Sequence, residues 1–484
     1  MCTVPKSRVS AVSMLAVTLS LAGCGAPDLG PLPQLRPPAN LQSSASIAPT
    51  AAQDAWPVQR WWTAYGDAQL NGLVDEALQG SPDVATALAR IRQAQGAMET
   101  SRASLLPQIN GQGSADVEKQ SYNNGTPAAV LPQGWKGYGS LALSASLDLD
   151  LWGKKRALLA AATSATEAAI ADERQAELTL SSQVVSSYFD LARLLERQKV
   201  LDQTLAARQQ SAKLVGQRVS QGIENQSPLR QSNAEAARAA IDGAANREQI
   251  ELRRHAIAAL LGAGPDRTRD LVPQPIATIP TTPVPADAGI ALAGRRPDIV
   301  VQRRLVEASD KTLEYARKSF LPDISLSGLI GLSSLGLSRL FDSGSDYGSA
   351  GAAISLPIFQ GGKLSGQYRL SRGGYDTEVA SYNKTVVTAL QEVADALSTR
   401  ASAAEQERHA IDARNQADAA LNLAGQRYRG GLNTYIDTLS VEDTAYQARL
   451  AAVDAHFSTL ASEVALKRAL GGGYTDESSK KAPL

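Results

Sequence analysis

The residues that most often carry enzyme chemistry are few in this 484-residue chain and stand far apart. His255, His409 and His456 each lie in a segment with helical patterning, without a cysteine or a second histidine nearby. Metal sites and catalytic histidines need converging partners, so we expect surface or helix-seam histidines. Gly361-Gly362-Lys363 lacks the spacing and the following Ser or Thr of a phosphate-binding loop. The sequence therefore predicts no enzyme and no catalytic, cofactor or metal residues.

The two cysteines, Cys2 and Cys24, both lie at the N-terminus, so the mature fold has no structural disulfide available. Residues 1–23 read as a signal peptide, because Lys6 and Arg8 precede an apolar run that is too short for a comfortable transmembrane helix. The run ends in Leu21-Ala22-Gly23-Cys24, which resembles the bacterial lipobox, in which the cysteine becomes the first residue and carries the lipid. An ordinary signal peptide with an incidental cysteine is the alternative.

The overall charge excludes one class of partner. Lys plus Arg and Asp plus Glu both number 48, so the net charge is zero, which argues against a nucleic-acid surface. Only 5% of residues are aromatic, while Ala, Gln and Ser are abundant. That composition suits close-packed helices better than a thick core.

A strand that leads into a very long helix organises the chain. From Leu141 to Leu151 apolar residues alternate with small or acidic ones, which predicts a strand with one apolar and one polar face. After the turn at Trp152-Gly153-Lys154 no proline occurs until Pro228. About 60 helical residues span on the order of 90 Å, deeper than a globular core. This combination indicates part of a membrane-anchored tube.

The same arrangement recurs later in the chain. The segment from Gly216 to Gly222 reappears 209 positions later as Gly425 to Gly431, and Leu106-Pro107-Gln108-Ile109 reappears 215 positions later as Leu321-Pro322-Asp323-Ile324. The six-residue difference predicts a longer loop in the first strand pair. A repeated unit of this size predicts two structural halves in one protomer.

The repeat and the proline-rich stretches predict the organisation of the chain. The expected parts are a signal peptide (1–23), a lipidated tether (24–60), a first repeat (61–264), a Pro-rich linker (265–295), a second repeat (296–471) and a disordered tail (472–484). Strand pairs are expected within 108–152 and 323–360, the second as strands 324–332 and 350–358. Helices are expected at 82–105, 229–261, 298–320, 364–425 and 433–470.

The predicted strands have the length that a tilted strand needs to cross hydrocarbon. Four strands cannot close a membrane barrel, because unpaired edges would face lipid, so several protomers must share one. A water-soluble β-sandwich with half-buried strands would explain the alternation of apolar and polar residues equally well. It would not explain why both strand pairs lead into such long helices.

The last predicted helix carries a regular apolar seam. Apolar side chains spaced alternately by four and three residues are typical of coiled-coil packing: Tyr446, Leu450, Val453, Phe457, Leu460 and Val464. An intramolecular helical bundle is the alternative.

From Trp61 to Gly471 the chain resembles the TolC-like outer-membrane efflux family, in its lipidated (OprM/NodT-type) branch. The resemblance rests on the lipobox, on Leu149-Asp150-Leu151-Trp152-Gly153-Lys154 with its counterpart 356–363, on the paired Leu-Pro-x-Ile strand entries and on the two Gly-Gln-Arg-x-x-x-Gly helix breaks. It implies an α+β membrane protein. The expected homotrimer combines a twelve-stranded outer-membrane β-barrel, four strands per protomer, with a long periplasmic α-helical barrel.

The resemblance also implies a function and partners. The chain would be the passive outer-membrane channel of a tripartite efflux system, held in outer-membrane lipid, with a periplasmic adaptor (membrane fusion) protein and an inner-membrane pump as partners. A periplasmic coiled-coil scaffold or adhesin stalk and a type I secretion outer-membrane conduit are the alternatives.

The resemblance further places the site residues. Cys24 would carry the lipid, and Gly222, Gly430 and Gly431 would permit tight turns between helices at the periplasmic tip. Asp437 matches a family aspartate that rings the closed aperture, with Tyr428 flanking the opening, whereas a second family aspartate is Ser440 here. The alternative role for Asp437 is a first-turn acid that stabilises a helix N-terminus.

Overall fold

The computed structural model describes residues 26–47, 56–123, 125–274 and 279–476. The chain forms two compact units. The first comprises Met1–Gln34, Ile91–Ala168 and Gln302–Ser381, and the second comprises Leu35–Arg90, Ala169–Val301 and Tyr382–Leu484. Each unit draws on both predicted repeats, 61–264 and 296–471.

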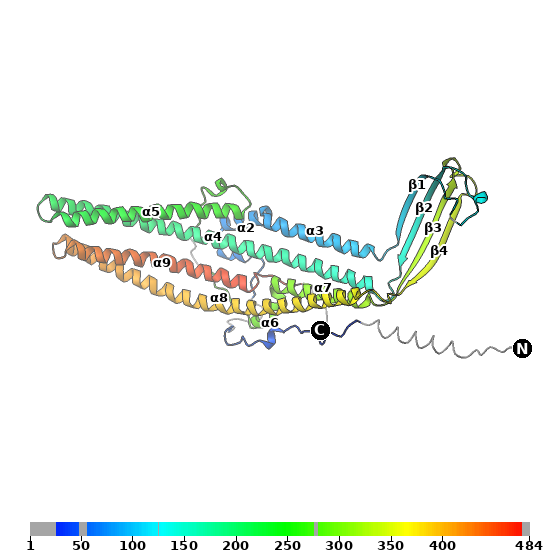
Figure 1. The fold of residues 1–484 in the computed structure, drawn as a ribbon. Coiled ribbons are helices and arrows are strands. Elements are labelled where there is room, and N and C mark those ends of the chain that lie inside the picture. Colours follow the sequence, from blue (N-terminus) through cyan, green and yellow to red (C-terminus); the bar gives the residue numbers. More distant parts are fainter. Residues whose placement is uncertain (1–25, 48–55, 124, 275–278, 477–484) are drawn as a thin grey trace. The chain divides into compact units, whose positions relative to one another are not determined.

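The first unit contains a four-stranded antiparallel sheet in the order β1-β2-β3-β4 (Figure 1). The strands are β1 (Gln108–Glu118), β2 (Lys136–Asp148), β3 (Asp323–Leu335) and β4 (Asp346–Ser355). The predicted strand pairs are therefore confirmed, and the β1–β2 loop is the longer of the two hairpin loops, as the spacing predicted. Since β2 pairs with β3, the two halves of the sequence share one sheet.

The register places most of the apolar strand residues on one face of the sheet, with Leu329 and Leu335 on the other. Ile109 pairs with Ala145, Leu143 with Ile330, and Ile324 with Ile354. Side chains alternate along a strand, so the neighbouring positions make up the opposite face, where Ser146 pairs with Gln108 and Ser327. The sheet thus has one apolar face and one face rich in Ser, Gln and Asn.

Two strands, β4 and β2, end earlier than predicted. β4 covers Asp346–Ser355 rather than 350–358, because Pro357 has no N–H to donate to a ladder. β2 ends at Asp148 rather than at residue 151, because Asp150 takes a left-handed backbone conformation with φ 45°.

The helices repeat the same lengths on either side of the chain's midpoint. After α3 (Pro82–Ala103) and the first strand pair come α4 (Lys154–Ser220, 67 residues) and α5 (Gln226–Leu260, 35 residues). After α7 (Pro297–Lys318) and the second strand pair come α8 (Lys363–Arg429, 67 residues) and α9 (Tyr435–Ala469, 35 residues). None of the helices in the described ranges combines the length and the apolar composition needed to cross a bilayer.

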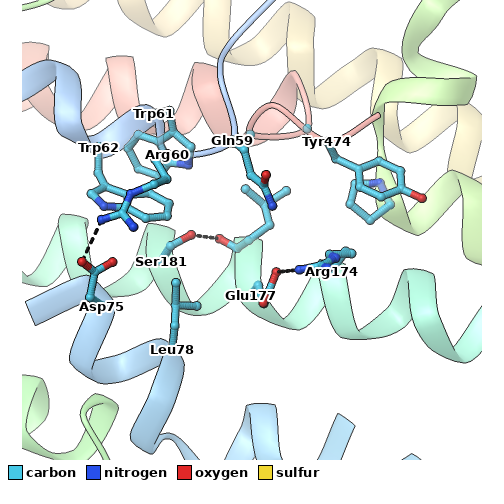
Figure 2. Close-up of a pocket in the computed structure, with 14 residues that line it drawn as sticks. Gln59, Arg60, Trp61, Trp62, Asp75, Leu78, Arg174, Glu177, Ser181 and Tyr474 are labelled. Atoms are coloured by element: carbon cyan, nitrogen blue, oxygen red, sulfur yellow. Dashed lines mark hydrogen bonds and ion pairs between the residues drawn. The ribbon is translucent and has the colours of Figure 1, made fainter. Parts of the chain in front are cut away.

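The second unit has an aromatic core where short elements pack on the long helices. The 3₁₀ helix η2 (Trp61–Tyr65) precedes α2 (Ala68–Gly80), and the rings of Trp61 and Trp62 meet edge to face with centroids 5.8 Å apart. Asp67 caps α2 and accepts a hydrogen bond from the buried Tyr188 hydroxyl at 2.5 Å. Beside the tryptophans lies a cavity of about 280 Å³ with ion pairs at its wall, Arg60–Asp75 and Arg174–Glu177 (Figure 2).

The seam predicted on α9 lies on its packed side. Leu450, Leu460 and Val464 are buried, and Tyr446, Val453 and Phe457 are half-buried. Burial of these residues within one chain also fits the bundle alternative, in which the seam is intramolecular.

Three stretches expected to be irregular are more structured than predicted. The linker 265–295 contains the short helices η4 (Pro265–Thr268) and α6 (Ala288–Arg295), because α6 buries Ala288 and Leu292. In the tail, the Asp476 amide donates to the Gly294 carbonyl at 3.0 Å, so 472–476 are held in place; 477–484 lie outside the described residues. In the tether, Pro38 begins the 3₁₀ helix η1 (Pro38–Asn40) and is buried.

Candidate functional site at the helix turns

The first helix turn joins α4 to α5 in the second unit and depends on Gly222. Its φ is +72°, a left-handed conformation that glycine adopts without strain. The Ile223 amide donates back to the Arg218 carbonyl at 2.9 Å, which closes the C-terminus of α4. Asn225 then caps α5 by accepting from the Ser227 amide. The predicted role of Gly222 in a tight turn agrees with this geometry.

The second turn joins α8 to α9 and repeats these contacts. Gly431 has φ +76°, and the Leu432 amide donates to the Arg427 carbonyl at 2.8 Å. Gly430 differs from the expectation: its φ is not positive, and its amide donates to the Gln426 carbonyl as in a helix. An added Cβ there would meet only ordinary contacts, so the backbone requires glycine at 431 but not at 430.

Asp437 lies in the first turn of α9 as part of a capping box. Its carboxylate accepts from the Thr434 amide at 3.1 Å and from the Thr434 hydroxyl at 2.7 Å, while the Asp437 amide donates to Thr434 Oγ1. These hydrogen bonds from Thr434 lower the pKa of the exposed carboxyl. The helix-cap role is therefore present in the protomer. Ser440, the position at which the resemblance implied a second aspartate, is also exposed.

Tyr428 does not face an opening within the protomer but lies buried between the two turns. Its hydroxyl donates to Glu224 Oε1 at 3.1 Å, and the Arg218 guanidinium lies 5.0 Å from its ring centroid. Arg218 Nε also lies 3.1 Å from Glu224 Oε1. Burial, with the hydrogen bond to Glu224, raises the pKa of Tyr428 to about 12, so the phenol remains a donor at neutral pH.

Apolar packing surrounds this polar contact. The Tyr428 and Tyr435 ring centroids are 6.1 Å apart, and both rings pack with Val215 and Leu439. The Tyr435 hydroxyl is buried and has no hydrogen-bond partner. The Tyr428 hydroxyl is thus one polar link between the two helix turns of one protomer, beside the Arg218 Nη1, which donates to the Tyr428 carbonyl at 3.5 Å. Tyr435 contributes packing alone.

An ionic layer around the buried Arg208 lies next to the turns. Arg208 of α4 pairs with Glu235 of α5 at 3.1 Å and with Asp443 of α9. Ser211 donates to Glu442, whose pKa is raised by burial. One arginine therefore joins three helices.

Arg218, Glu224 and Arg208 were not among the predicted site residues. The signal for Arg218 was present, because Arg218 belongs to the repeated Gly-Gln-Arg motif. No local pattern distinguishes Glu224 or Arg208 from solvent-exposed charges, since Glu224 meets Tyr428 of α8, and Arg208 meets partners on α5 and α9.

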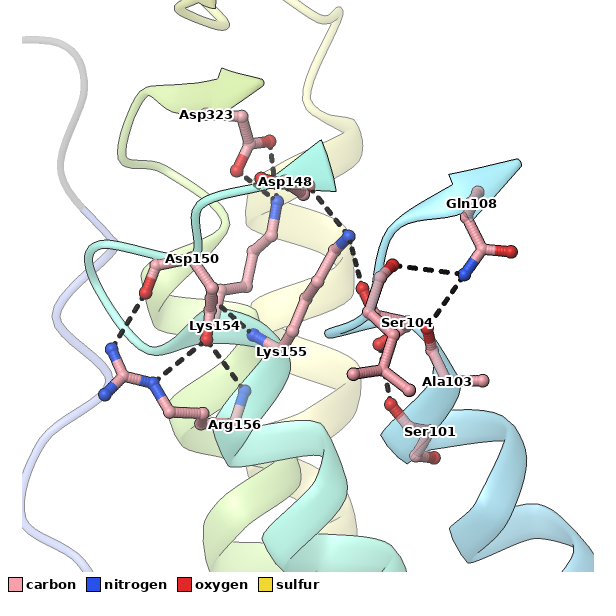
Figure 3. A network of polar contacts seen from close by, with 11 residues as sticks. Ser101, Ala103, Ser104, Gln108, Asp148, Asp150, Lys154, Lys155, Arg156 and Asp323 are labelled. Atoms are coloured by element: carbon pink, nitrogen blue, oxygen red, sulfur yellow. Dashed lines mark hydrogen bonds and ion pairs between the residues drawn. The ribbon is translucent and has the colours of Figure 1, made fainter. Parts of the chain in front are cut away.

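A second polar cluster fixes the junction where the sheet enters the helices of the first unit (Figure 3). Lys154 Nζ lies 2.5 Å and 2.6 Å from the two Asp323 carboxylate oxygens, and Lys155 Nζ lies 2.9 Å from Asp148. Asp150 accepts from the amides of Lys155 and Arg156 and so caps α4. These contacts join β2, β3 and α4, which makes the strand-to-helix turn rigid.

The other predicted residues are placed as follows. Cys24 lies outside the described residues. His255 and His409 are exposed, and His456 Nδ1 lies 2.7 Å from Glu407 Oε1. In the part of the chain that the structure describes, no group of three or more His, Cys, Asp or Glu side chains could hold a metal ion.

The profile of the family described as Outer membrane efflux protein matches residues 73–263 and 291–472. The chain belongs to this family. It is 28% identical to the multidrug resistance outer membrane protein MdtQ of Escherichia coli O157:H7, over 96% of this chain and 98% of that protein. It is also 28% identical to MdtP of Escherichia coli O6:H1, over 97% of each.

Solved channels share the fold. The outer membrane protein VceC of Vibrio cholerae is 37% identical with a TM-score of 0.81, covering 87% of this chain and all of that one. The outer-membrane channel OprN is 27% identical with a TM-score of 0.83, covering 93% and 99%. The predicted family, outer-membrane location and efflux-channel function are confirmed, and the scaffold and type I secretion alternatives are not favoured.

Proposed function

We propose that three copies of this chain form one efflux channel in which each sheet supplies a third of a closed outer-membrane β-barrel. The observation that carries this proposal is the sheet itself, with an apolar face, a polar face and two edge strands, β1 and β4, that have no partner strand in the described chain. Unpaired backbone groups are too costly in lipid, so the edges must pair with copies. The apolar face would contact lipid and the polar face would line the lumen.

The same proposal assigns partners and cargo. The homologues' names contain the words multidrug resistance, which favours small organic toxins as substrates. A passive channel cannot supply the energy for active transport. An inner-membrane pump would therefore supply it, and the pump and a periplasmic adaptor would deliver the substrates to the helix turns. The internal repeat would arise by duplication, which the equal lengths of α4 and α8 and of α5 and α9 support.

The turn between α8 and α9 would form the periplasmic aperture. Asp437 is exposed beside this turn, so three copies brought together would form a ring of carboxylates. Like charges at short range raise one another's pKa, so closure would need hydrogen bonds or cations. The Tyr428–Glu224 contact would hold the two turns of each protomer together in the closed state.

Cys24 would carry the lipid anchor after removal of residues 1–23. Its acyl chains would strengthen the attachment of the chain to the membrane, which the embedded barrel also provides. Each buried methylene would contribute about 0.8 kcal/mol to the free energy of membrane binding. Mass spectrometry of the mature N-terminus checks this assignment: an unmodified Cys24, or a start at another residue, contradicts it.

The channel proposal is tested by recording single-channel currents of the purified protein in planar bilayers. A trimeric pore gives discrete conductance steps, whereas a scaffold gives none. The recordings are made with divalent-free buffer on the periplasmic side and, separately, on the extracellular side. A protein that circular dichroism shows to be folded, but that conducts under neither condition, would overturn the proposal.

A further inference from the structure

The Arg372 side chain on α8 binds the N-terminal segment of the chain. Its Nη1 donates to the Gly30 carbonyl at 3.0 Å, and its Nη2 donates to the Pro31 carbonyl. Its Nε donates to Asp376 Oδ1 at 2.8 Å, one turn further along α8. Arg372 is only 7% exposed, and a buried guanidinium is tolerated only when its donors are satisfied. The N-terminal segment supplies two of the acceptors that satisfy it.

The N-terminal segment is shaped to present those two carbonyls. Gly30 has φ +77°, and its amide donates to Asp28 Oδ1 at 2.9 Å, which forms a local turn. An added Cβ at Gly30 would meet nothing within 4 Å, so glycine is needed for the backbone conformation and not for space. The turn places consecutive carbonyls against one planar guanidinium, a geometry that a lysine ammonium cannot reproduce.

Chain length links this contact to the candidate lipid site. Gly30 follows Cys24 by six residue steps, a reach of at most about 20 Å. Arg372 lies nine residues into α8, about 14 Å from the start of the helix, which follows β4. A lipid on Cys24 therefore stays within reach of the end of the sheet where β4 leads into α8.

We propose that α8 carries a docking site for the lipid-proximal end of this chain, with Arg372 as the residue that holds it. The site fixes the acyl anchor next to the base of the sheet. The segment from Asp28 to Pro31 is therefore bound to α8 and is not a free tether. The proposal rests on lipidation of Cys24 for the position of the anchor. The docking contact itself is independent of lipid and of conduction.

The test uses a spin label at Leu32, whose side chain is 47% exposed next to the bound carbonyls. The full chain with Leu32→Cys is purified with Cys24 lipidated, so the new thiol is the one labelled. Electron paramagnetic resonance is expected to show a restricted label in the parent and a severalfold shorter correlation time in Arg372→Ala. The label in Arg372→Lys is expected to have a mobility between those in the parent and in Arg372→Ala.

Matched variants separate the docking contact from general damage. Arg369→Ala, an exposed arginine one turn away, leaves the label restricted. Gly30→Ala releases the label without altering α8, while Gly30→Asn, which tolerates positive φ, retains it. An equally restricted label in Arg372→Ala and Gly30→Ala overturns the proposal.

The lipid itself provides the last comparison. The comparison variant combines Cys2→Ser with Cys24→Ser, so that the introduced thiol is again the one labelled. In this double variant the label stays restricted if Arg372 holds the segment. A label that becomes mobile in it overturns the proposal, because the restraint then comes from the membrane. Labelling of Cys24 in the parent, read by mass spectrometry, would refute lipidation alone, and absent channel currents would refute the proposed function alone.

Discussion

At the scale of single residues, two tyrosines at the helix turns have different roles although they pack together. Tyr428 combines packing with a hydrogen bond to Glu224 across the two turns, whereas the buried Tyr435 hydroxyl has no partner. Removing a hydroxyl that satisfies a buried acceptor costs stability, and removing an unpaired one does not. This contrast makes Tyr435 the natural control for Tyr428.

We expect Tyr428→Phe to lower the free energy of unfolding by about 1 kcal/mol and to raise the open probability of the channel. Tyr435→Phe should leave both unchanged. Thermal melts and single-channel recordings measure the two effects. Equal behaviour of the two variants would show that the Tyr428–Glu224 hydrogen bond does not hold the turns closed.

Asp437 requires a different control, because its carboxylate both caps α9 and, in the proposed trimer, faces the aperture. Asp437→Ala should change conductance and its sensitivity to divalent cations while trimers still form. Thr434→Ala removes the capping partner but keeps the charge, and should leave the cation sensitivity intact. If Thr434→Ala reproduces the change, or if Asp437→Ala matches the parent from pH 5 to 8, Asp437 acts only as a cap.

At the scale of elements, the C-terminal turns of α9 are held against η2 through a buried lysine. Lys467 Nζ donates to the Tyr65 hydroxyl at 3.2 Å and lies 4.5 Å from that ring centroid. Burial lowers the pKa of Lys467 to about 8, although Glu463 opposes the shift, and burial raises the pKa of Tyr65. The contact between α9 and η2 is therefore sensitive to alkaline pH.

The sign of this dependence follows from proton linkage. Between about pH 8 and pH 10 the unfolded chain keeps the Lys467 proton and the folded chain loses it, so stability rises, by up to about 3 kcal/mol. Above pH 10 Tyr65 loses its proton in the unfolded chain but keeps it in the folded chain, so the free energy of unfolding falls. Denaturant melts followed by circular dichroism measure this curve, and Lys467→Met should remove its rising part. A rise that persists in Lys467→Met would assign it to another group.

At the scale of the whole molecule, the sheet has two edges that one chain cannot satisfy. β1 pairs only with β2 and β4 pairs only with β3 within the described residues. Burying these edges in lipid without partners would cost several kcal/mol per unpaired group. In the proposed barrel, assembly is therefore a condition for membrane insertion.

We expect native mass spectrometry in detergent to show three copies. Urea-dissociated chains should lose strand signal in circular dichroism before helical signal, because isolated edges are not stable while α4, α5, α8 and α9 keep their packing. The helix signal serves as the internal control. A stable monomer that conducts would contradict the shared barrel.

The sequence by itself determined the elements of this protein. Alternation from Leu141, the proline-free stretch before Pro228 and the glycines at 222 and 431 are local signals, so strands, long helices and turns were predicted within a few residues. The 209-residue recurrence also indicated that the second half repeats the order of the first. Local propensity and periodicity are sufficient for this because they act between residues close in the chain.

Only the tertiary structure decided which residues meet. Glu224 with Tyr428, Arg208 with Asp443, and Arg372 with Gly30 are pairs whose members are separated by many residues. Helix α6 also depends on tertiary structure. The prolines around it favoured an irregular linker, and the helix forms because Leu292 is buried in the core. Partners distant in sequence leave no local pattern, since their pairing depends on how the long helices pack.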